Sequence, residues 1–280
     1  MKKISRRSFL AAAAVSAAAL ALTACGGSAS TASSAAASSV AASSEAASTS
    51  AAAAELTTVE AGKLTMATNA TFPPYEMTTD AGAFEGIDID TAQAIADKLG
   101  LELQIDDMDF DAALLSVQQG KADIAMAGVT VTDERMNVMD FSDSYATGIQ
   151  SIIVPEGSDI ASPDDLAGKK IGTQRGTTGY IYCSDDFGDD AVVAYDDGLT
   201  AVQALNNGQV DAVVIDNAPA KEFVAANPGL VILDTSYAEE DYAIGLAKGS
   251  ALEDAVNAAL EELKADGTLQ SIVDKYITAE

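Results

Sequence analysis

Residues 127–135 read AGVTVTDER, and this stretch predicts the end of a buried strand followed by the start of a helix. The apolar residues Ile124–Met126 precede it, and a glycine permits the turn that follows. Thr132 can cap the helix, and the two acidic residues after it lie where the helix dipole favours negative charge. Arg135 then follows the carboxyl end of a strand, where open α/β sheets bind ligands and where a guanidinium can hold a carboxylate.

A second stretch repeats the pattern. Residues 117–128 (VQQGKADIAMAG) and 205–216 (LNNGQVDAVVID) follow the same pattern. In both, a glycine follows the end of a helix, an aspartate stands three residues after the glycine, and an apolar strand follows the aspartate. The repeat predicts two similar α/β lobes, although Arg135 alone is equally consistent with a surface ion pair. Because Arg135 follows the first strand and Asp216 ends the second, one lobe offers a cation and the other an anion. A zwitterion such as a free α-amino acid could bridge them.

The amino-terminal residues 1–24 have the features of an export signal. A basic segment is followed by an alanine-rich apolar run, Phe9 to Leu22, that is short for a membrane span. Residues 22–25 (LTAC) resemble a bacterial lipobox, which implies cleavage before Cys25 and attachment of a lipid such as palmitate to its thiol. Residues 5–10 also resemble a twin-arginine signal, so the export route stays open.

Residues 25–56 are dominated by Ser and Ala and have almost nothing to bury, which predicts a disordered tether. The tether would hold the folded part, from residue 57 to residue 280, at the outer face of the cell membrane, where Cys25 anchors it. No other apolar run is long enough to span a bilayer.

Composition excludes several chemistries. The chain has no histidine, which removes Ser–His and Cys–His pairs and most zinc sites, so we expect no metal and no cofactor. After lipidation Cys183 would be the only cysteine left, so no disulfide within one chain is possible. The 15 basic and 43 acidic residues argue against a nucleic-acid partner. The turn 175–179 (RGTTG) could hold an anion but lacks the signature of a phosphate loop, and a plain turn is equally consistent with it.

Two aromatic residues are expected on the same side of the sheet. A first strand is predicted at Lys63–Thr68, and Phe72 follows it in a loop held extended by two prolines. Phe110 lies at the start of a later helix. Either ring could instead pack its loop onto the core. The chain is expected to end with a returning strand over 242–247 and two helices, around 252–263 and 269–276.

Six segments in order resemble the polar amino-acid substrate-binding proteins of ABC importers, solute-binding family 3. They are residues 72–76 (FPPYE), 86–90 (GIDID), 127–135, 140–143 (DFSD), 176–179 (GTTG) and 264–268 (KADGT). The resemblance covers residues 62–276. It implies an α/β, two-lobed periplasmic-binding-protein type II fold with two hinge strands. The lobe limits that it implies are 57–148 for the first part of lobe 1, 149–238 for lobe 2 and 239–280 for the second part of lobe 1.

The resemblance also implies a ligand site. Arg135 should bind the α-carboxylate of an amino acid, helped by backbone amides near Thr130 and Thr177. Asp216 should bind the ammonium, together with the Gly128 carbonyl and the Thr130 hydroxyl. A bound amino acid would then be held at both charged ends.

Four further residues are implied around the ligand's side chain. Phe72 and Phe110 should sandwich it, and Asn69 and Gln174 should touch its end. Relatives that hold lysine or arginine usually carry a carboxylate where Asn69 stands, which favours a neutral, glutamine-like ligand here.

The resemblance implies a binding protein, not an enzyme, that works as a monomer and delivers its amino acid to ABC permease subunits. Two alternatives stay open. A dehydratase-like lipoprotein enzyme on the same fold would need a protonatable acid such as Glu76 or Asp88, and the spacing places neither in the cleft. A sensor of amino acids is the other alternative, although the chain shows no signalling domain.

Overall fold

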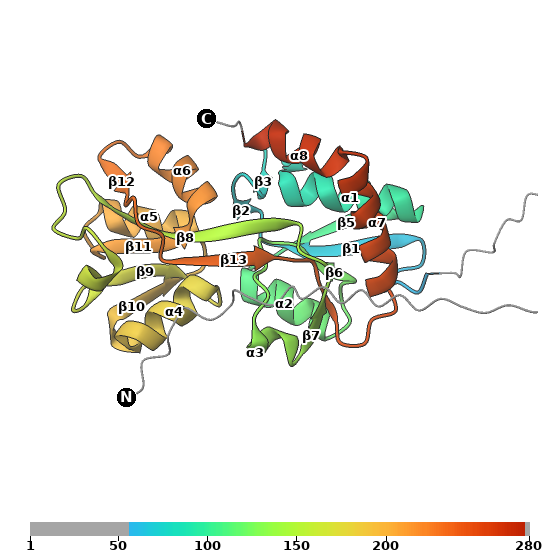
Figure 1. The fold of residues 1–280 in the computed structure, drawn as a ribbon, viewed down its shortest axis with the longest axis horizontal. Helices are drawn as coiled ribbons and strands as arrows, with labels where there is room; N and C mark the ends of the chain where they lie inside the picture. Colours follow the sequence, from blue (N-terminus) through green and yellow to red (C-terminus); the bar gives the residue numbers. More distant parts are fainter. Residues whose placement is uncertain (1–55, 278–280) are drawn as a thin grey trace, which may run out of the picture. The chain divides into compact units, whose positions relative to one another are not determined.

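The computed structural model describes residues 56–277, which form two α/β lobes, each built on its own sheet (Figure 1). The predictions for the export signal, for Cys25 and for residues 25–55 of the tether lie outside the described residues. Within residues 56–277, none of the helices combines the length and the apolar character needed to cross a membrane.

The first sheet combines strands from the early and the late parts of the described chain. Its strand order is β5 (Glu102–Asp107), β1 (Lys63–Thr68), β6 (Ile124–Ala125), β14 (Gly245–Ala247) and β7 (Met139–Phe141). Strand β1 is parallel to β5 and β6, whereas β14 is antiparallel to its neighbours. One face is covered by α1 (Ile87–Leu99), α7 (Glu253–Ala265) and α8 (Thr268–Tyr276), and α2 (Phe110–Gln118) lies on the other (Figure 1).

The second sheet has the same order of strand types. It runs β10 (Val192–Tyr195), β9 (Ile171–Gln174), β11 (Ala212–Asp216), β8 (Ala146–Pro155) and β12 (Leu230–Ile232). Here β9 is parallel to β10 and β11, and β8 is antiparallel to β11. Its helices are α4 (Thr178–Phe187), α5 (Gly198–Asn206) and α6 (Asn217–Ala226), with short 3₁₀ turns at Pro163–Leu166 and Asp189–Ala191.

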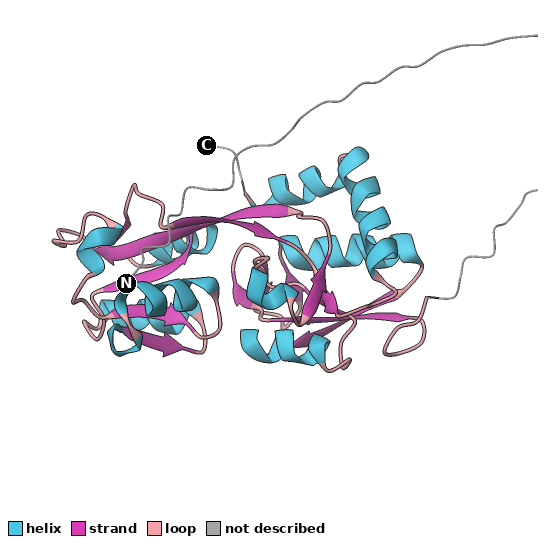
Figure 2. Ribbon diagram, turned by 60° about the horizontal axis from the view of Figure 1, so that its bottom comes forward, coloured by secondary structure: helices cyan, strands magenta, loops and turns pink. Residues whose placement is uncertain are grey.

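Two long strands connect the lobes. Strand β8 pairs antiparallel with β13 (Ala238–Tyr242), and Figure 2 shows the two running side by side from one sheet toward the other. The predicted two-lobed α/β architecture with two connecting strands is confirmed. The predicted limits at 148/149 and 238/239 fall inside β8 and β13, and the lobe limits themselves stay a prediction.

Three short strands and one short helix complete the first lobe near its contact with the second. Strands β2 (Thr71–Phe72), β3 (Glu76–Thr78) and β4 (Phe84–Glu85) form a small antiparallel sheet. Helix α3 (Asp133–Met136) begins as predicted at Thr132, whose hydroxyl accepts a hydrogen bond of 3.1 Å from the Arg135 amide.

The strand predicted over residues 242–247 is two strands. Strand β13 ends at Tyr242, and β14 begins at Gly245 in the other sheet. Between them the Ile244 amide donates to the Ser142 hydroxyl at 2.9 Å instead of joining a ladder. The chain therefore changes sheets here, and a continuous apolar pattern could not reveal that change.

The repeat read from the sequence is present in both lobes. Gly120 and Gly208 follow α2 and α5 with the same φ of 66°, a left-handed conformation that suits glycine. Asp123 then accepts a hydrogen bond from the Thr65 amide at 2.8 Å, and Asp211 accepts one from the Lys170 amide at 2.7 Å. Each aspartate stands directly before a strand, β6 or β11, and ties it to the parallel neighbouring strand, β1 or β9.

Candidate functional site

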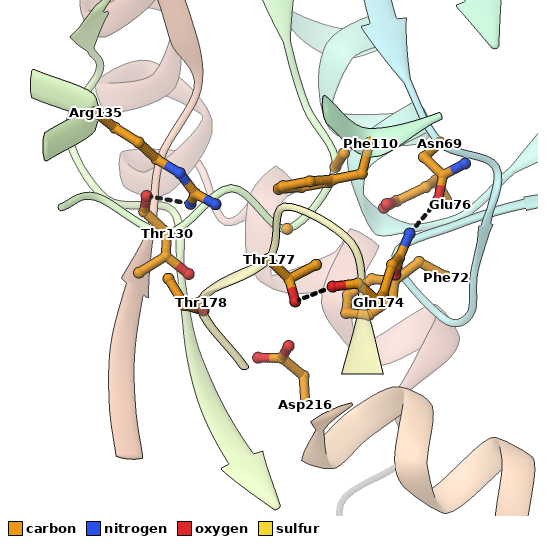
Figure 3. Close-up of a pocket in the computed structure, with 12 residues that line it drawn as sticks. Asn69, Phe72, Glu76, Phe110, Thr130, Arg135, Gln174, Thr177, Thr178 and Asp216 are labelled. Carbon is orange, nitrogen blue, oxygen red and sulfur yellow. Dashed lines mark hydrogen bonds between the residues drawn. The ribbon is translucent and has the colours of Figure 1, made fainter. Parts of the chain in front are cut away.

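The side chains that line the pocket in Figure 3 come from both lobes. The lining includes all nine residues expected from the sequence: Asn69, Phe72, Phe110, Gly128, Thr130, Arg135, Gln174, Thr177 and Asp216. It also includes Glu76, Ala127 and Thr178, which were not among the residues predicted to bind the ligand. The structure thus brings the predicted residues together, and their ligand contacts stay a prediction.

Arg135 is a buried cation at one end of the pocket. Its guanidinium donates to the Thr130 carbonyl at 2.8 Å and, across to the second lobe, to the Gly176 carbonyl at 3.1 Å. It also lies 5.3 Å from the centre of the Phe110 ring, within range of a cation–π contact. These three contacts fix the plane of the guanidinium.

Among residues 56–277, no carboxylate forms an ion pair with Arg135. Burial lowers the pKa of Arg135, and the negative field of Glu240 opposes that shift, but a guanidinium keeps its proton at any physiological pH. Since two of its five N–H groups serve carbonyls, the others are free to bind an anion.

Asp216 is a buried anion supplied by the second lobe. It is the last residue of β11 and stands directly before α6, where the helix dipole favours negative charge. Tyr242 donates its hydroxyl to one carboxylate oxygen, and the Gln150 amide donates to the other at 2.8 Å. Burial, together with the nearby Glu240 carboxylate, raises the pKa of Asp216 to about 7. A cation beside Asp216 would favour its ionised form.

Two phenylalanines form the apolar walls. Phe72 comes from β2 and Phe110 opens α2. The Phe72 ring lies so close to Gly128 that a Cβ there would approach ring atom Cε1 to 3.0 Å. With a φ of 55°, residue 128 also has a conformation that other residues rarely adopt. Glycine is therefore required between the strand end and the ring.

The far end of the pocket is polar. Gln174 of the second lobe donates to the Asn69 amide oxygen of the first at 2.8 Å, and Asn69 in turn donates to the Met108 carbonyl at 2.9 Å. This hydrogen bond joins the two lobes across the pocket. It also turns the Asn69 and Gln174 side chains toward the same space, as Figure 3 shows.

Glu76 is the residue that sequence reasoning did not place. It begins β3, is fully buried, and lies beside Asn69 at the end of the pocket away from Arg135 (Figure 3). Neither of its oxygens accepts a hydrogen bond from an amide, amine or hydroxyl group of the described residues. Burial, and then the neighbouring Asp88 carboxylate, raise the pKa of Glu76 well above its usual value. The motif FPPYE contains Glu76, but spacing alone gives no reason to turn it inward.

Asp88, the other acid considered from the sequence, does not line the pocket. It accepts hydrogen bonds from the Gly128 amide at 2.9 Å and from the Tyr145 hydroxyl at 2.7 Å. Burial nevertheless raises the pKa of Asp88 to about 6. Its contacts indicate a structural role beneath the strand end.

Two threonines at the start of α4 face the pocket. Thr177 caps the helix by accepting from the Tyr180 amide at 3.3 Å, and its hydroxyl donates to the Gln174 carbonyl at 2.8 Å. Thr178 is buried, and its hydroxyl donates to Glu240 at 2.9 Å. Both belong to the segment GTTG, so this motif was the signal that pointed to Thr178. Within residues 56–277, no group of three or more acidic or cysteine side chains is arranged to hold a metal.

Comparisons with known proteins identify the family of this chain. The family model described as bacterial extracellular solute-binding proteins, family 3, matches residues 64–279. The L-cystine-binding protein TcyJ of Escherichia coli (strain K12) is 33% identical over 226 residues, which cover 79% of this chain and 85% of that protein. The arginine-binding extracellular protein ArtP of Bacillus subtilis (strain 168) is 31% identical over 230 residues, covering 78% and 87% of the two chains.

A solved structure gives the same answer. An ancestral arginine-binding protein bound to glutamine matches with a TM-score of 0.74 and 42% identity, covering 78% of this chain and 99% of that chain. The type II fold expected from the sequence is thereby confirmed. Because the family model spans most of the chain and the identities exceed 30% over most of its length, the chain belongs to the bacterial extracellular solute-binding proteins, family 3.

Proposed function

We propose that this protein captures a free polar L-amino acid between its lobes and delivers it to an ABC importer. The observation that carries the proposal is the placement of Arg135 and Asp216, a buried cation and a buried anion from different lobes, on one small pocket. Arg135 would bind the α-carboxylate and Asp216 the α-ammonium. A zwitterion satisfies both charges at once, whereas a simple anion or cation leaves one unpaired.

Binding would be coupled to closure of the lobes. When the lobes are apart, both charges face water; when they close on an amino acid, each gains an ion partner as water leaves. The amino acid therefore binds the closed form better than the open one, which is the differential affinity that a conformational change requires. The connecting strands β8 and β13 are the natural place for the hinge.

The polar end of the pocket supports a glutamine-like ligand. Asn69 and Gln174 offer amide groups there, and an amide side chain could exchange hydrogen bonds with both. The ancestral arginine-binding protein bound to glutamine is a similar chain that accepts this ligand.

Glu76 favours a second candidate, a cationic amino acid such as arginine. A buried carboxyl without a hydrogen-bond donor is costly, and a guanidinium or ammonium at the end of the ligand would supply one. ArtP, named as an arginine-binding protein, is a relative of this chain. The choice between the two ligand classes rests on the charge state of Glu76.

A thermal-shift screen of the folded protein against the twenty L-amino acids tests the proposal, because a ligand that binds only the folded state raises the melting temperature. We expect a clear shift with a small set that includes glutamine or arginine, and recovery of the amino acid unchanged. No shift with any of the twenty would contradict the proposal. Conversion of the amino acid would favour an enzyme.

The variant Glu76→Gln separates the two ligand classes. If the ligand is cationic, this variant loses the shift with arginine, whereas Glu85→Gln, on the exposed edge of the same small sheet, keeps it. If the ligand is glutamine, both variants keep the shift.

Export, lipidation of Cys25 and a monomeric state belong to the proposal as well. Labelled palmitate should be incorporated into the wild-type protein and not into Cys25→Ser, and this comparison would test the anchor.

A further inference from the structure

Glu240 is a buried carboxylate on the strand that connects the lobes. It lies near the middle of β13, opposite Gly148 of β8, and is 6% exposed. It does not line the pocket, and no motif of the sequence pointed to it. Its neighbours, however, are residues that do.

One oxygen of Glu240 collects hydrogen bonds from both lobes. Oε2 accepts from the Thr130 hydroxyl at 3.1 Å, from the Thr178 hydroxyl at 2.9 Å and from the Gln150 amide at 3.0 Å. Thr130 precedes α3 in the first lobe, and Thr178 opens α4 in the second. Figure 3 shows the two threonine side chains next to one another. This set of contacts ties both lobes to the connecting strand β13.

The direction of these hydrogen bonds determines what the threonines offer the pocket. A carboxylate has no proton and can only accept, so each threonine must turn its single hydroxyl proton toward Glu240. Thr178 also accepts from the Gln150 amide at 3.5 Å, and the other lone pairs of Thr130 and Thr178 are what remains for a ligand. Both hydroxyls become acceptors, and only a group with N–H or O–H protons can use them.

Gln150 extends the same arrangement to Asp216. Its amide nitrogen lies 2.8 Å from Asp216, 3.0 Å from Glu240 and 3.5 Å from the Thr178 hydroxyl, so its two protons serve mainly the two carboxylates. Asp216 itself can only accept when ionised. Asp216, Thr130 and Thr178 therefore present acceptors to one corner of the pocket, which suits the three protons of an ammonium group.

We propose that Glu240 is a positioning residue that makes the pocket select the α-ammonium group of its ligand. It acts through Thr130 and Thr178, whose hydroxyl protons it holds away from the ligand. The inference rests on the proposed function, since it names how the ammonium end of the same site gains its selectivity.

The test compares amino acids with analogues that lack the α-amino group. Calorimetry would measure the wild-type protein and Glu240→Gln with L-glutamine and glutaramate, and with L-arginine and 5-guanidinopentanoate. In the wild type the amino acid should bind far more tightly than its analogue. In Glu240→Gln this preference should shrink by about 10- to 100-fold, the range for hydrogen bonds to charged groups, while affinity for the analogue changes little.

Matched variants make the outcome specific. Glu239→Gln alters an exposed neighbour on the same strand and should keep the full preference. Thr178→Ser retains the hydroxyl and should also keep it, whereas Thr178→Val should lose it, which tests the route if Glu240→Gln does not fold.

Equal losses for the amino acid and its analogue would overturn the inference, because a merely structural role weakens both. An unchanged preference in Glu240→Gln would overturn it as well. If the wild-type protein binds no amino acid at all, the proposed function fails instead.

Discussion

The two lobes have the same arrangement of strands up to the end of β6 in the first lobe and of β11 in the second. In the first sheet β1 lies between its parallel neighbours β5 and β6, and the antiparallel strand β14 follows β6. In the second sheet β9 lies between its parallel neighbours β10 and β11, and the antiparallel strand β8 follows β11. In the second lobe β11 runs straight into α6, so its last residue, Asp216, stands at a helix start. In the first lobe β6 is followed by a loop and the short helix α3, which carries Arg135 back over the strand end. The path of the chain after β6 and after β11 therefore decides which charge each lobe brings to the pocket.

The largest expected effect comes from the charge of the first lobe. Arg135→Ala should weaken amino-acid binding by about 2–5 kcal/mol, as when one partner of a buried charge pair is removed. Arg175→Ala is the control, because the side chain of this exposed arginine of the second lobe donates to the Ala194 carbonyl, lies 3.6 Å from Asp196 and does not line the pocket. Calorimetry of both variants measures the difference. Equal affinities for Arg135→Ala and the wild type would remove the first lobe's share of the site.

The charge of the second lobe should show itself in the pH dependence of binding. Because the pKa of Asp216 in the empty pocket is raised to about 7, lowering the pH below 7 protonates the group that an ammonium needs. Proton and ligand then compete, and affinity should fall by about tenfold per pH unit below 7. Asp216→Asn should bind weakly and without this slope. A wild-type affinity that is constant from pH 5 to pH 8 would contradict the assignment.

The repeated aspartates should differ in their contribution to stability. Asp123 is buried and accepts from the Val59 amide at 2.7 Å and the Thr65 amide at 2.8 Å, whereas Asp211 is exposed and accepts from one amide. Asp123→Ala should lower the free energy of unfolding by about 1–3 kcal/mol, because it leaves buried amides without an acceptor. Asp211→Ala should cost less than about 1 kcal/mol. Urea unfolding measures the free energy of unfolding of both variants. Equal losses would show that Asp123 and Asp211 contribute equally to stability.

The contact between the lobes at the polar end of the pocket should have the smallest effect. Gln174→Ala removes the hydrogen bond to Asn69 and should weaken ligand binding by about 0.5–1.5 kcal/mol. Gln209→Ala, an exposed amide of the same lobe, serves as the control in the same titration. An equal effect of the two substitutions would mean that the Asn69 contact does not support the closed form.

Much of this architecture was readable from the chain because local signals and the repeat agreed. The glycine–aspartate pattern around Asp123 and Asp211 predicted the strands β6 and β11. Residues at the ends of these two strands, or just beyond them, meet in the pocket. The cap at Thr132 placed Arg135 on the correct helix turn. Where a residue's position follows from the end of a strand or the start of a helix, the sequence was sufficient.

The residues that were missed depend on contacts between distant segments. Glu240 lies in the run AEEDY, whose acidic residues are unfavourable in strands, and β13 exists because it pairs with β8. Glu76 is turned inward by the small sheet of β2 to β4, whose strands are two or three residues long. No periodic pattern can be seen over so few residues. The acids behind the pocket were therefore visible only in the fold.

The most direct measurement is a crystal structure of the chain with the amino acid that gives the largest rise in melting temperature. We predict that one molecule lies between the lobes, with its α-carboxylate on the Arg135 guanidinium and its ammonium against the Asp216 carboxylate. A ligand bound to one lobe alone, or with its charged ends away from these two side chains, would contradict the account.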